Sequence, residues 1–532
     1  MLVRLFPMEC TKVHQIIQSS LSLIFKKVPL VRVIVQTLYQ NGGRVFLVGG
    51  AVRDIILSKD VKDLDIEVHE VSLEKLEAVL KGFGPVRLVG KAYGVLRIDG
   101  LDIDFSIPRT DGKGRLPEVV LDPNMSIEQA CKRRDLTMNA MAIDMYSGVF
   151  FDPFGGLKDL EKKQLRAPNP ELFIEDPLRF YRVMQFAARF ETEPDQRLDQ
   201  LCATMNIEQV SHDRIVHEFE KLFLQSKKPS IAFKWLEKID RLKSILPELY
   251  AIIGVEQHPA YHPEGDVFEH TMQAIDGAAR AAYPTDEKRL ILVLAALCHD
   301  LGKATTTRTV DGVLRAYGHD VAGVALADQL LDRVLTKPTL KNAIIRLVRY
   351  HMDPISLVKN NAKAGSYKRL AKKLAPYATL TDLAQLAMFD KSARTPTNKV
   401  SSSDVPLELS GDLSCEARRV QEKAFVKTGD LAKREISVAK EDQTMPMPGV
   451  ASWRRGEDCS GKLIQTFLKN AQKYGVADGP ELPILTGNDI AQEVPEGREV
   501  GLLLQRAYEI QIEEGVTDKN DLKKRVMKSR SV

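Results

Sequence analysis

A change in hydrophobic periodicity near residue 176 divides this sequence into two parts. Before it, short runs rich in Val, Ile and Leu alternate with helical segments and are interrupted by Gly and Asp. We predict strands at Arg44–Val48, Leu64–Val68, Gly94–Ile98 and Leu101–Ile107, and helices at Val52–Leu57 and Leu73–Lys81. After it, amphipathic runs such as Pro177–Phe190 and Arg289–Leu297 predict an almost wholly helical body. The expected fold class is α+β.

Composition limits the classes of protein that remain possible. The net charge is only +4, so any RNA-binding surface has to be a local basic stripe. The six cysteines are far apart and form no CxxC, which argues against a disulfide framework or a cysteine zinc site and favours the cytoplasm. No apolar run reaches the ~18–20 residues needed to cross a bilayer, so no membrane partner is expected.

The first candidate site follows the first predicted strand. Gly49-Gly50 lies between that strand and a helix, where a bare backbone can approach a phosphate beside free helical N–H groups. Alone, such a turn is usually only a tight turn. Asp63 and Asp65 follow at strand spacing and share one face, and two adjacent carboxylates repel each other unless a cation such as Mg²⁺ lies between them. Asp102 or Asp104 could add a third carboxylate. We predict a two-metal nucleotidyl-transfer site.

The second candidate site lies on predicted helices. His270, the adjacent pair His299-Asp300, and Asp353 offer two imidazoles and two carboxylates. A lone buried His is more often a core residue than a ligand, but an adjacent His-Asp pair after an apolar run, with a His 29 residues upstream, is rarely only structural. These ligands suit a divalent metal that keeps positions open for water. His351 could replace Asp353.

Five segments carry a resemblance to a known family. They are Gly49–Asp54, Asp63–Asp65, Arg133–Ala140, Asp152–Gly156 and Glu175–Arg179. In this order they resemble the head-and-neck motifs of the class II tRNA nucleotidyltransferases, which comprise CCA-adding enzymes, their CC- and A-adding relatives, and bacterial poly(A) polymerases. The resemblance implies a polymerase-β-like head followed by an all-α neck, body and tail.

The resemblance also implies roles for single residues. The nucleotide-binding set is Gly49, Gly50, Arg53, Arg133, Arg134, Asp135, Asp176, Arg179 and Arg182, and the catalytic Mg²⁺ ligands are Asp63 and Asp65. In the family, the Arg-Arg-Asp motif contacts ribose and phosphates. Asp176 and Arg179, one turn apart on a predicted helix, would read the incoming base. Cytosine and adenine both present an amine donor beside a ring-nitrogen acceptor, whereas guanine and uracil present the reverse.

Two further segments resemble longer family members. His262–Glu264, His270, His299–Lys303 and Gly318-His319 resemble the HD domain of multifunctional proteobacterial CCA-adding enzymes. That domain implies phosphatase, 2′-nucleotidase and 2′,3′-cyclic phosphodiesterase activities with Mg²⁺, Mn²⁺ or Ni²⁺. Pro483–Ile490, with Tyr508 and Gln511, resembles their terminal region.

The segment Thr110–Pro117 is rich in Gly and charged residues, which predicts either a mobile loop or an ordinary surface hairpin. In the family, a flexible loop here accompanies addition of the terminal A. It therefore favours complete CCA addition over CC addition.

The expected organisation has six parts. They are an N-terminal extension (1–43), a nucleotidyltransferase head (44–165), a helical neck (166–255), an HD domain (256–394), an unassigned segment (395–480) and a tail (481–532). The expected function is template-independent addition of CCA to tRNA from CTP and ATP, with a second phosphohydrolase activity. A monomer and a homodimer both remain open. Alternatives are a poly(A) polymerase, which the HD motifs disfavour, a CC- or A-adding enzyme, and an HD phosphohydrolase with an RNA-binding head.

Overall fold

The computed structural model describes residues 7–61, 63–89, 94–111, 119–259, 261–394, 459–491, 493–494 and 497–529. Most of the predicted loop at 110–117, and most of the unassigned segment 395–480, lie outside these residues. The elements below belong to one compact unit, residues 1–395 and 460–532. In this described part of the chain, no helix is long and apolar enough to cross a membrane.

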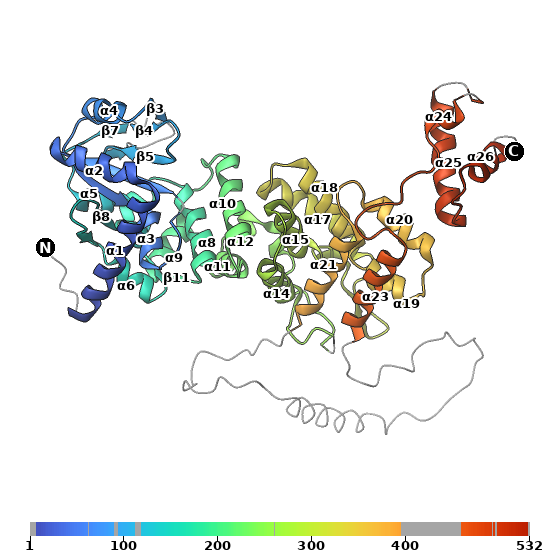
Figure 1. Cartoon of the computed structure of the whole chain (residues 1–532). Coiled ribbons are helices and arrows are strands. Elements are labelled where there is room, and N and C mark those ends of the chain that lie inside the picture. Colours follow the sequence, from blue (N-terminus) through green and yellow to red (C-terminus); the bar gives the residue numbers. More distant parts are fainter. Residues whose placement is uncertain are drawn as a thin grey trace, which may run out of the picture. The chain divides into compact units, whose positions relative to one another are not determined.

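The head contains a seven-stranded mixed sheet in the order β3-β4-β5-β2-β1-β8-β9. Its strands are β1 (Arg44–Val48), β2 (Leu64–His69), β3 (Val86–Val89), β4 (Val95–Ile98), β5 (Ile103–Ser106), β8 (Ala142–Asp144) and β9 (Phe150–Phe151). Only β2 and β5 pair in parallel. The pairing sets Asp65 opposite Asp104 in register. The labelled strands lie in the blue to teal part of Figure 1, and helices follow. The predicted α+β fold class is confirmed.

Helices cover this sheet and include most of the N-terminal extension. They are α1 (Pro7–Lys27), α2 (Pro29–Gln40), α3 (Gly50–Ile56), α4 (Leu73–Lys81), α5 (Ile127–Lys132), the 3₁₀ turn η1 (Thr137–Asn139) and α6 (Gly156–Glu161). Ile17 of α1 and Ile34 of α2 are fully buried in the same core as Ile66 of β2 and Phe105 of β5. The extension is therefore an integral layer of the head.

The neck and HD region share a continuous helical core. The helices are α7 (Pro170–Phe173), α8 (Leu178–Phe190), α9 (Gln196–Thr204), α10 (His212–Gln225), α11 (Ser230–Lys238), α12 (Leu242–Ile245), α13 (Pro247–Tyr250), α14 (Val267–Arg280), α15 (Asp286–Cys298), α16 (Lys303–Thr306), α17 (His319–Val334), α18 (Pro338–Tyr350), α19 (Asp353–Lys359), α20 (Ala364–Leu374) and α21 (Leu380–Ser392). Every residue from Leu290 to Cys298 in α15 is buried, which makes this helix the centre of the body.

Two short strand pairs correct the prediction of an all-α neck and body. β10 (Gln164–Leu165) pairs with β11 (Glu193–Pro194). β12 (Arg308–Val310) and β13 (Val313–Arg315) form a hairpin through Asp311 and Gly312. Both turn residues have positive φ, 51° and 73°, as a two-residue type I′ turn requires. The Asp-Gly pair was the sequence signal for this hairpin.

The C-terminal elements complete the unit. α23 (Cys459–Lys473) places Ile464 and Phe467 in the body core, which assigns part of the previously unassigned segment. α24 (Gly487–Ile490), α25 (Arg498–Glu514) and α26 (Lys519–Ser529) share a separate small core. Gln511 accepts from the backbone N–H of Ile484 at 3.0 Å and donates to the carbonyl oxygen of Leu482 at 2.9 Å. Gln511 therefore holds the segment before α24 that contains Leu482 and Ile484 against α25.

Candidate functional sites

The turn between β1 and α3 brings backbone close to a carboxylate and an arginine. Gly49 has φ +71°, a conformation that favours glycine. A Cβ at this position would lie 3.1 Å from Nη1 of Arg134 and 3.5 Å from Oδ2 of Asp65. Any side chain here would be strained and would crowd both groups. The turn therefore joins two motifs that are more than 60 residues apart in the sequence.

Three carboxylates gather beside this turn. Burial raises the pKa of Asp65, the negative charges of Asp104 and Asp63 act in the same direction, and Arg134 opposes them. Asp104 is itself 2.6 Å from Nη2 of Arg97, whereas Asp102 is 82% exposed. Of the two candidates for a third carboxylate, Asp104 is therefore the one next to Asp65. Clustered carboxylate oxygens that repel one another are a donor set that suits Mg²⁺.

Glu67, which sequence reasoning missed, continues the same strand face. It is buried, and its Oε2 lies 2.9 Å from Nη2 of Arg133 and 3.6 Å from Nη2 of Arg134. Burial alone would raise the pKa of Glu67, but His69 and the two arginines outweigh it and bring the pKa to about 2. The period-two spacing of Asp63, Asp65 and Glu67 was the available signal. Glu67 therefore anchors the Arg-Arg-Asp segment on β2.

Asp135 connects that segment with the neck. Its Oδ1 accepts from the backbone N–H of Leu136 at 2.7 Å and from Nδ2 of Asn139 at 3.0 Å, and its Oδ2 lies 2.6 Å from Nε of Arg182. Burial alone would raise the pKa of Asp135, but Arg182 and Asn139 outweigh it and bring the pKa to about 2. The buried carboxylate thus stays charged and ties η1 to α8.

Arg53 is buried between the head and α8. Its guanidinium donates to Oδ1 of Asp54 at 2.8 Å and to Oδ1 of Asn139 at 2.7 Å, and its Cζ lies 4.5 Å from the ring centroid of Phe190. These contacts leave the side chain only 4% exposed. We therefore expect Arg53 to position the turn rather than to touch a nucleotide, which differs from the prediction.

Asp176 lies just before α8, and Arg179 lies in the first turn of that helix. The carbonyl oxygen of Asp176 accepts from the backbone N–H of Arg179 at 3.0 Å, so the two residues are one turn apart at the start of the helix. Oδ1 of Asp176 accepts from the backbone N–H of Leu178 at 3.1 Å. The guanidinium of Arg179 donates to the carbonyl oxygens of Leu172, at 2.8 Å, and Arg133, at 2.6 Å. Arg179 thus joins the start of α8 to the Arg-Arg-Asp segment.

The Asp-Pro-Phe-Gly-Gly motif supports the same segment. The carboxylate of Asp152 accepts from the backbone N–H groups of Gly156, at 2.6 Å, and Leu157, at 3.0 Å, at the start of α6. A Cβ at Gly156 would collide with the carbonyl oxygen of Thr137. The motif therefore allows α6 to pack closely against η1.

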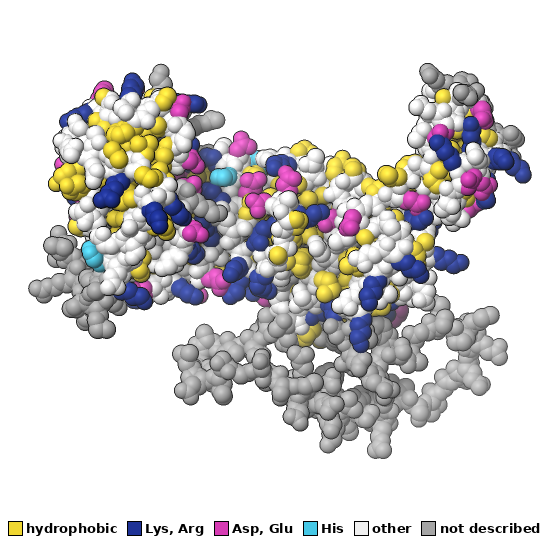
Figure 2. Space-filling view, in the orientation of Figure 1, with side chains coloured by type: hydrophobic (Ala, Val, Ile, Leu, Met, Phe, Trp, Pro, Cys, Tyr) yellow, Lys and Arg dark blue, Asp and Glu magenta, His cyan; other side chains and the backbone are white. Residues whose placement is uncertain are grey.

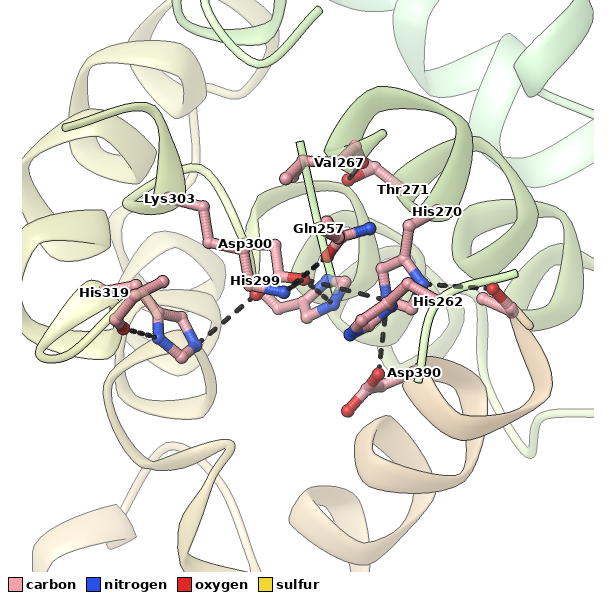
Figure 3. Close-up of polar contacts among 12 residues, drawn as sticks. Gln257, His262, Val267, His270, Thr271, His299, Asp300, Lys303, His319 and Asp390 are labelled. Carbon is pink, nitrogen blue, oxygen red and sulfur yellow. Dashed lines mark hydrogen bonds and ion pairs between the residues drawn. The ribbon is translucent and has the colours of Figure 1, made fainter. Parts of the chain in front are cut away.

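A second cluster of potential ligands surrounds Asp300 at the end of α15 (Figure 3). Its members come from six separate parts of the body and are mostly buried: His262, Glu264, His270, His299, Asp300, His319, His351 and Asp390. In Figure 3 the imidazoles of His270, His299 and His319 lie around the carboxylate of Asp300. Lys303 donates to that carboxylate at 2.7 Å. The predicted ligands His270, His299 and Asp300 are thus brought together.

Each imidazole of the cluster is oriented through its Nδ1. Nδ1 of His270 lies 2.6 Å from Oε1 of Glu264. The rings of three other histidines use backbone carbonyl oxygens: His299 to Ala296 at 2.9 Å, His319 to Ala316 at 2.7 Å, and His351 to Val348 at 2.7 Å. Each Nε2 is left to face the interior of the cluster. At metal sites, a hydrogen bond of this kind at the nitrogen that does not bind the metal fixes the orientation of the ring and its tautomer.

Asp353 is not part of this cluster, which corrects the predicted ligand set. It begins α19, and its pKa is raised by burial, with Lys373 and Arg349 as the opposing positive charges. Asp390 of α21 stands in its place, with Oδ1 3.2 Å from Nε2 of His270. No motif marks Asp390 in the sequence; only the packing of α21 against α14 brings it to His270. His351, the alternative considered for Asp353, lies in the cluster.

The donor set fits divalent metal ions. In each group of three, His270-His299-Asp300 and Asp300-His319-His351, the ligand atoms lie within 4.8 Å of one another. Ligands about 2.0–2.2 Å from one ion have such separations. The buried Nε2 atoms of His270 and His299 each lie 3.2 Å from a carboxylate oxygen, Oδ1 of Asp390 and Oδ2 of Asp300 respectively. Burial and the neighbouring His299 and His319 lower the pKa of His351 to about 4, so the ring is neutral near pH 7.

Models of known protein families match the chain at both candidate sites. The model described as the poly A polymerase head domain matches residues 45–166, and the HD domain model matches residues 267–385. A model described as the probable RNA and SrmB-binding site of polymerase A matches residues 198–252. The HD match ends before Asp390, which agrees with the absence of a local signal for this residue.

Curated relatives match more than half of the chain. A protein named multifunctional CCA protein from Mannheimia succiniciproducens is 35% identical over 319 residues, which is 58% of this chain and 74% of the relative. A protein of the same name from Pasteurella multocida is 34% identical, with the same coverage. The chain belongs to the multifunctional CCA protein family. The resemblance to class II tRNA nucleotidyltransferases is thereby confirmed.

Solved structures agree on the fold of this family member. The Thermotoga maritima CCA-adding enzyme complexed with tRNA aligns with a TM-score of 0.52 and 18% identity, covering 95% of each chain. The Bacillus stearothermophilus CCA-adding enzyme in complex with CTP gives a TM-score of 0.53 and 18% identity, covering 94% of this chain and 97% of that one. At this identity, the likeness extends to the fold alone.

Proposed function

We propose that this chain adds CCA to the 3′ end of tRNA from CTP and ATP, releasing pyrophosphate. The observation that supports this most is the convergence of Asp65, Asp104, Arg134 and Gly49 at one turn of a family head domain. Asp63 and Asp65 would hold Mg²⁺, with Asp104 beside them. Bound Mg²⁺ supplies activation of the attacking 3′-hydroxyl and stabilisation of the leaving pyrophosphate.

The surrounding residues would place the nucleotide. Arg134 and the backbone at Gly49-Gly50 lie beside the carboxylates and would take the phosphates. Arg133 and Arg182 are each held by a buried carboxylate, Glu67 and Asp135 respectively, which limits the movement of their guanidinium groups. tRNA contacts would be local, because Figure 2 shows basic and acidic side chains mixed over the helical part of the face in view. A polar surface of this kind suits transient RNA contacts better than processive RNA holding.

The direct test is incorporation into defined tRNA ends. Purified protein is incubated with tRNA ending before CCA, after C or after CC, and with each labelled nucleotide separately. We expect CTP to be used on the first two ends and ATP only on the third. Repeated A addition to any RNA would instead identify a poly(A) polymerase, and no addition with any nucleotide would overturn the proposal.

We expect Asp176→Ala to relax nucleotide choice more than it slows transfer. Asp176 lies just before α8, whose Arg179 contacts the Arg-Arg-Asp segment, and a matched base contact is worth ~1–3 kcal/mol, or roughly 5- to 150-fold. Arg179→Lys should lower kcat/KM for both CTP and ATP, since lysine lacks the planar guanidinium group that donates to two carbonyl oxygens. The measurement is kcat/KM for all four nucleotides on a tRNA acceptor. Equal losses with every nucleotide after Asp176→Ala would make the residue only a helix cap.

Glu67→Gln is expected to reduce kcat/KM for CTP and ATP while Mg²⁺ dependence stays close to normal. The substitution removes the negative charge that holds Arg133 and Arg134, and such a buried contact is worth about 1–3 kcal/mol, or roughly 5- to 150-fold. Glu77→Gln, at a half-exposed position on α4, is the matched control. A Glu67→Gln enzyme with normal steady-state constants would show that Arg133 and Arg134 keep their place without it.

A second activity is proposed for the HD region, a metal-dependent hydrolysis of phosphate esters. It is supported by the cluster around Asp300 and by the HD family match. His270, His299, Asp300 and Asp390 would hold a divalent metal, which supplies a nucleophilic water at neutral pH. Imidazole nitrogens suit Ni²⁺ and carboxylate oxygens suit Mg²⁺ and Mn²⁺, so the cluster offers ligands to each of these ions. Lys303 lies next to this position and could pair with a substrate phosphate.

A further inference from the structure

The carboxylate of Asp300 faces two separate sets of imidazoles. Its Oδ2 lies 3.2 Å from Nε2 of His299 and 3.7 Å from Nε2 of His270. Its Oδ1 lies 3.4 Å from Nε2 of His319 and 3.9 Å from Nε2 of His351. One carboxylate thus presents a different oxygen to each set. A single metal ion bound by the first set would leave Oδ1 of Asp300 and the two histidines of the second set without a metal ion to bind.

The second set has the geometry of a group of metal ligands. Nε2 of His319 and Nε2 of His351 are only 3.1 Å apart. Each ring places its Nδ1 2.7 Å from a backbone carbonyl oxygen, so Nδ1 acts as the hydrogen-bond donor and Nε2 is left as an acceptor. Two lone pairs and a carboxylate oxygen then converge on one point. They repel one another unless a cation lies between them.

We propose that the HD centre holds two divalent metal ions bridged by Asp300. His270, His299 and Asp390, with Oδ2 of Asp300, form the first position, and His319 and His351, with Oδ1 of Asp300, form the second. This inference rests on the proposed metal-dependent function of the HD region. The second position has three protein ligands and so keeps sites open for oxygen atoms from water or from a phosphate ester. Paired ions about 3.5–4 Å apart stabilise the attacking and leaving oxygens in phosphate ester hydrolysis.

Metal content of the whole chain tests the two positions. The full-length protein, carrying Asp63→Ala and Asp65→Ala to remove the head ligands, is loaded with Mn²⁺, desalted and analysed for metal per chain. We expect two ions in this background, and one ion after either His319→Gln or His351→Ala. His217→Ala, at an exposed histidine outside the cluster, should retain two ions.

Spin coupling provides the second readout. Two Mn²⁺ ions that share Asp300 should give an exchange-coupled electron paramagnetic resonance spectrum, and His319→Gln should convert it to that of an isolated ion. Circular dichroism and the transferase assay of each single variant in the otherwise unmodified chain confirm that it folds. One ion in the starting protein, or an unchanged metal content in both folded histidine variants, would overturn the two-ion centre. Two coupled ions without hydrolysis of any phosphate ester would uphold the centre and overturn the proposed hydrolase.

Discussion

Asp65→Ala should lower nucleotide incorporation by about a thousand-fold or more. Stabilisation by a catalytic metal ion is worth several kcal/mol, and each 1.4 kcal/mol changes a rate about tenfold. Asp65 lies at the centre of the carboxylate group, in register with Asp104 and beside Arg134, so its loss removes the ligand nearest to the glycine turn. The measurement is single-turnover incorporation of labelled CTP into tRNA lacking CCA, at saturating Mg²⁺.

Two controls make this result specific. Asp102→Ala removes an exposed carboxylate of the same β4–β5 connection and should leave the rate within about twofold, as expected for a surface substitution. Hydrolysis of phosphate esters by Asp65→Ala should be unchanged, because the HD cluster has its own ligands. Retention of more than a few per cent of transfer activity by Asp65→Ala would contradict the assignment of this carboxylate.

Asp300→Asn should abolish phosphate ester hydrolysis and leave CCA addition intact. The change removes the only carboxylate of the described chain that faces both sets of histidines, so metal binding at either position loses a charged ligand. Hydrolysis of 2′,3′-cyclic nucleotides is measured after chelation and after return of Mg²⁺, Mn²⁺ or Ni²⁺. Return of the metal ion should restore hydrolysis by the wild-type protein but not by Asp300→Asn.

Asp353→Asn is the matched control for Asp300→Asn. The sequence placed Asp353 among the ligands, whereas in the structure it begins α19 beside Arg349 and Lys373 and belongs to neither group of ligand atoms. The Asp353→Asn variant should therefore keep its phosphate ester hydrolysis, and the Asp390→Asn variant should lose it. The opposite pattern would restore the ligand set expected from the sequence and reject the one seen in the structure.

The elements that sequence predicted well are those whose signal is local. β1 and α4 have the predicted bounds, because alternating or helical apolar spacing is complete within each segment. Asp65 and Asp300 were found because each belongs to a short motif with its own chemistry. The role of the N-terminal extension, by contrast, depends on buried contacts of Ile17 and Ile34 with strands that come later in the chain.

The residues that sequence missed depend on contacts between distant segments. Asp390 reaches His270 only through the packing of α21 on α14, 120 positions away in the chain. Glu67 had a signal in its strand spacing, but its pairing with Arg133 joins segments 66 residues apart. The spacing of Asp176 and Arg179 predicted that both lie on one helix, whereas α8 begins at Leu178 and the side chain of Asp176 accepts from the backbone N–H of that residue. Local periodicity contains no information on such pairings.

The hydrogen bond from Arg179 to the carbonyl oxygen of Arg133 has a consequence for fidelity. If Arg179 reads the base, its displacement by a mismatched nucleotide also disturbs the segment that carries Arg133 and Arg134. Recognition of the base and alignment of the phosphates then form one thermodynamic coupling rather than two independent checks. An incorrect nucleotide would lose rate in the chemical step as well as affinity, so discrimination against it would persist at saturating concentration. Selectivity of this kind resists imbalance in cellular nucleotide pools.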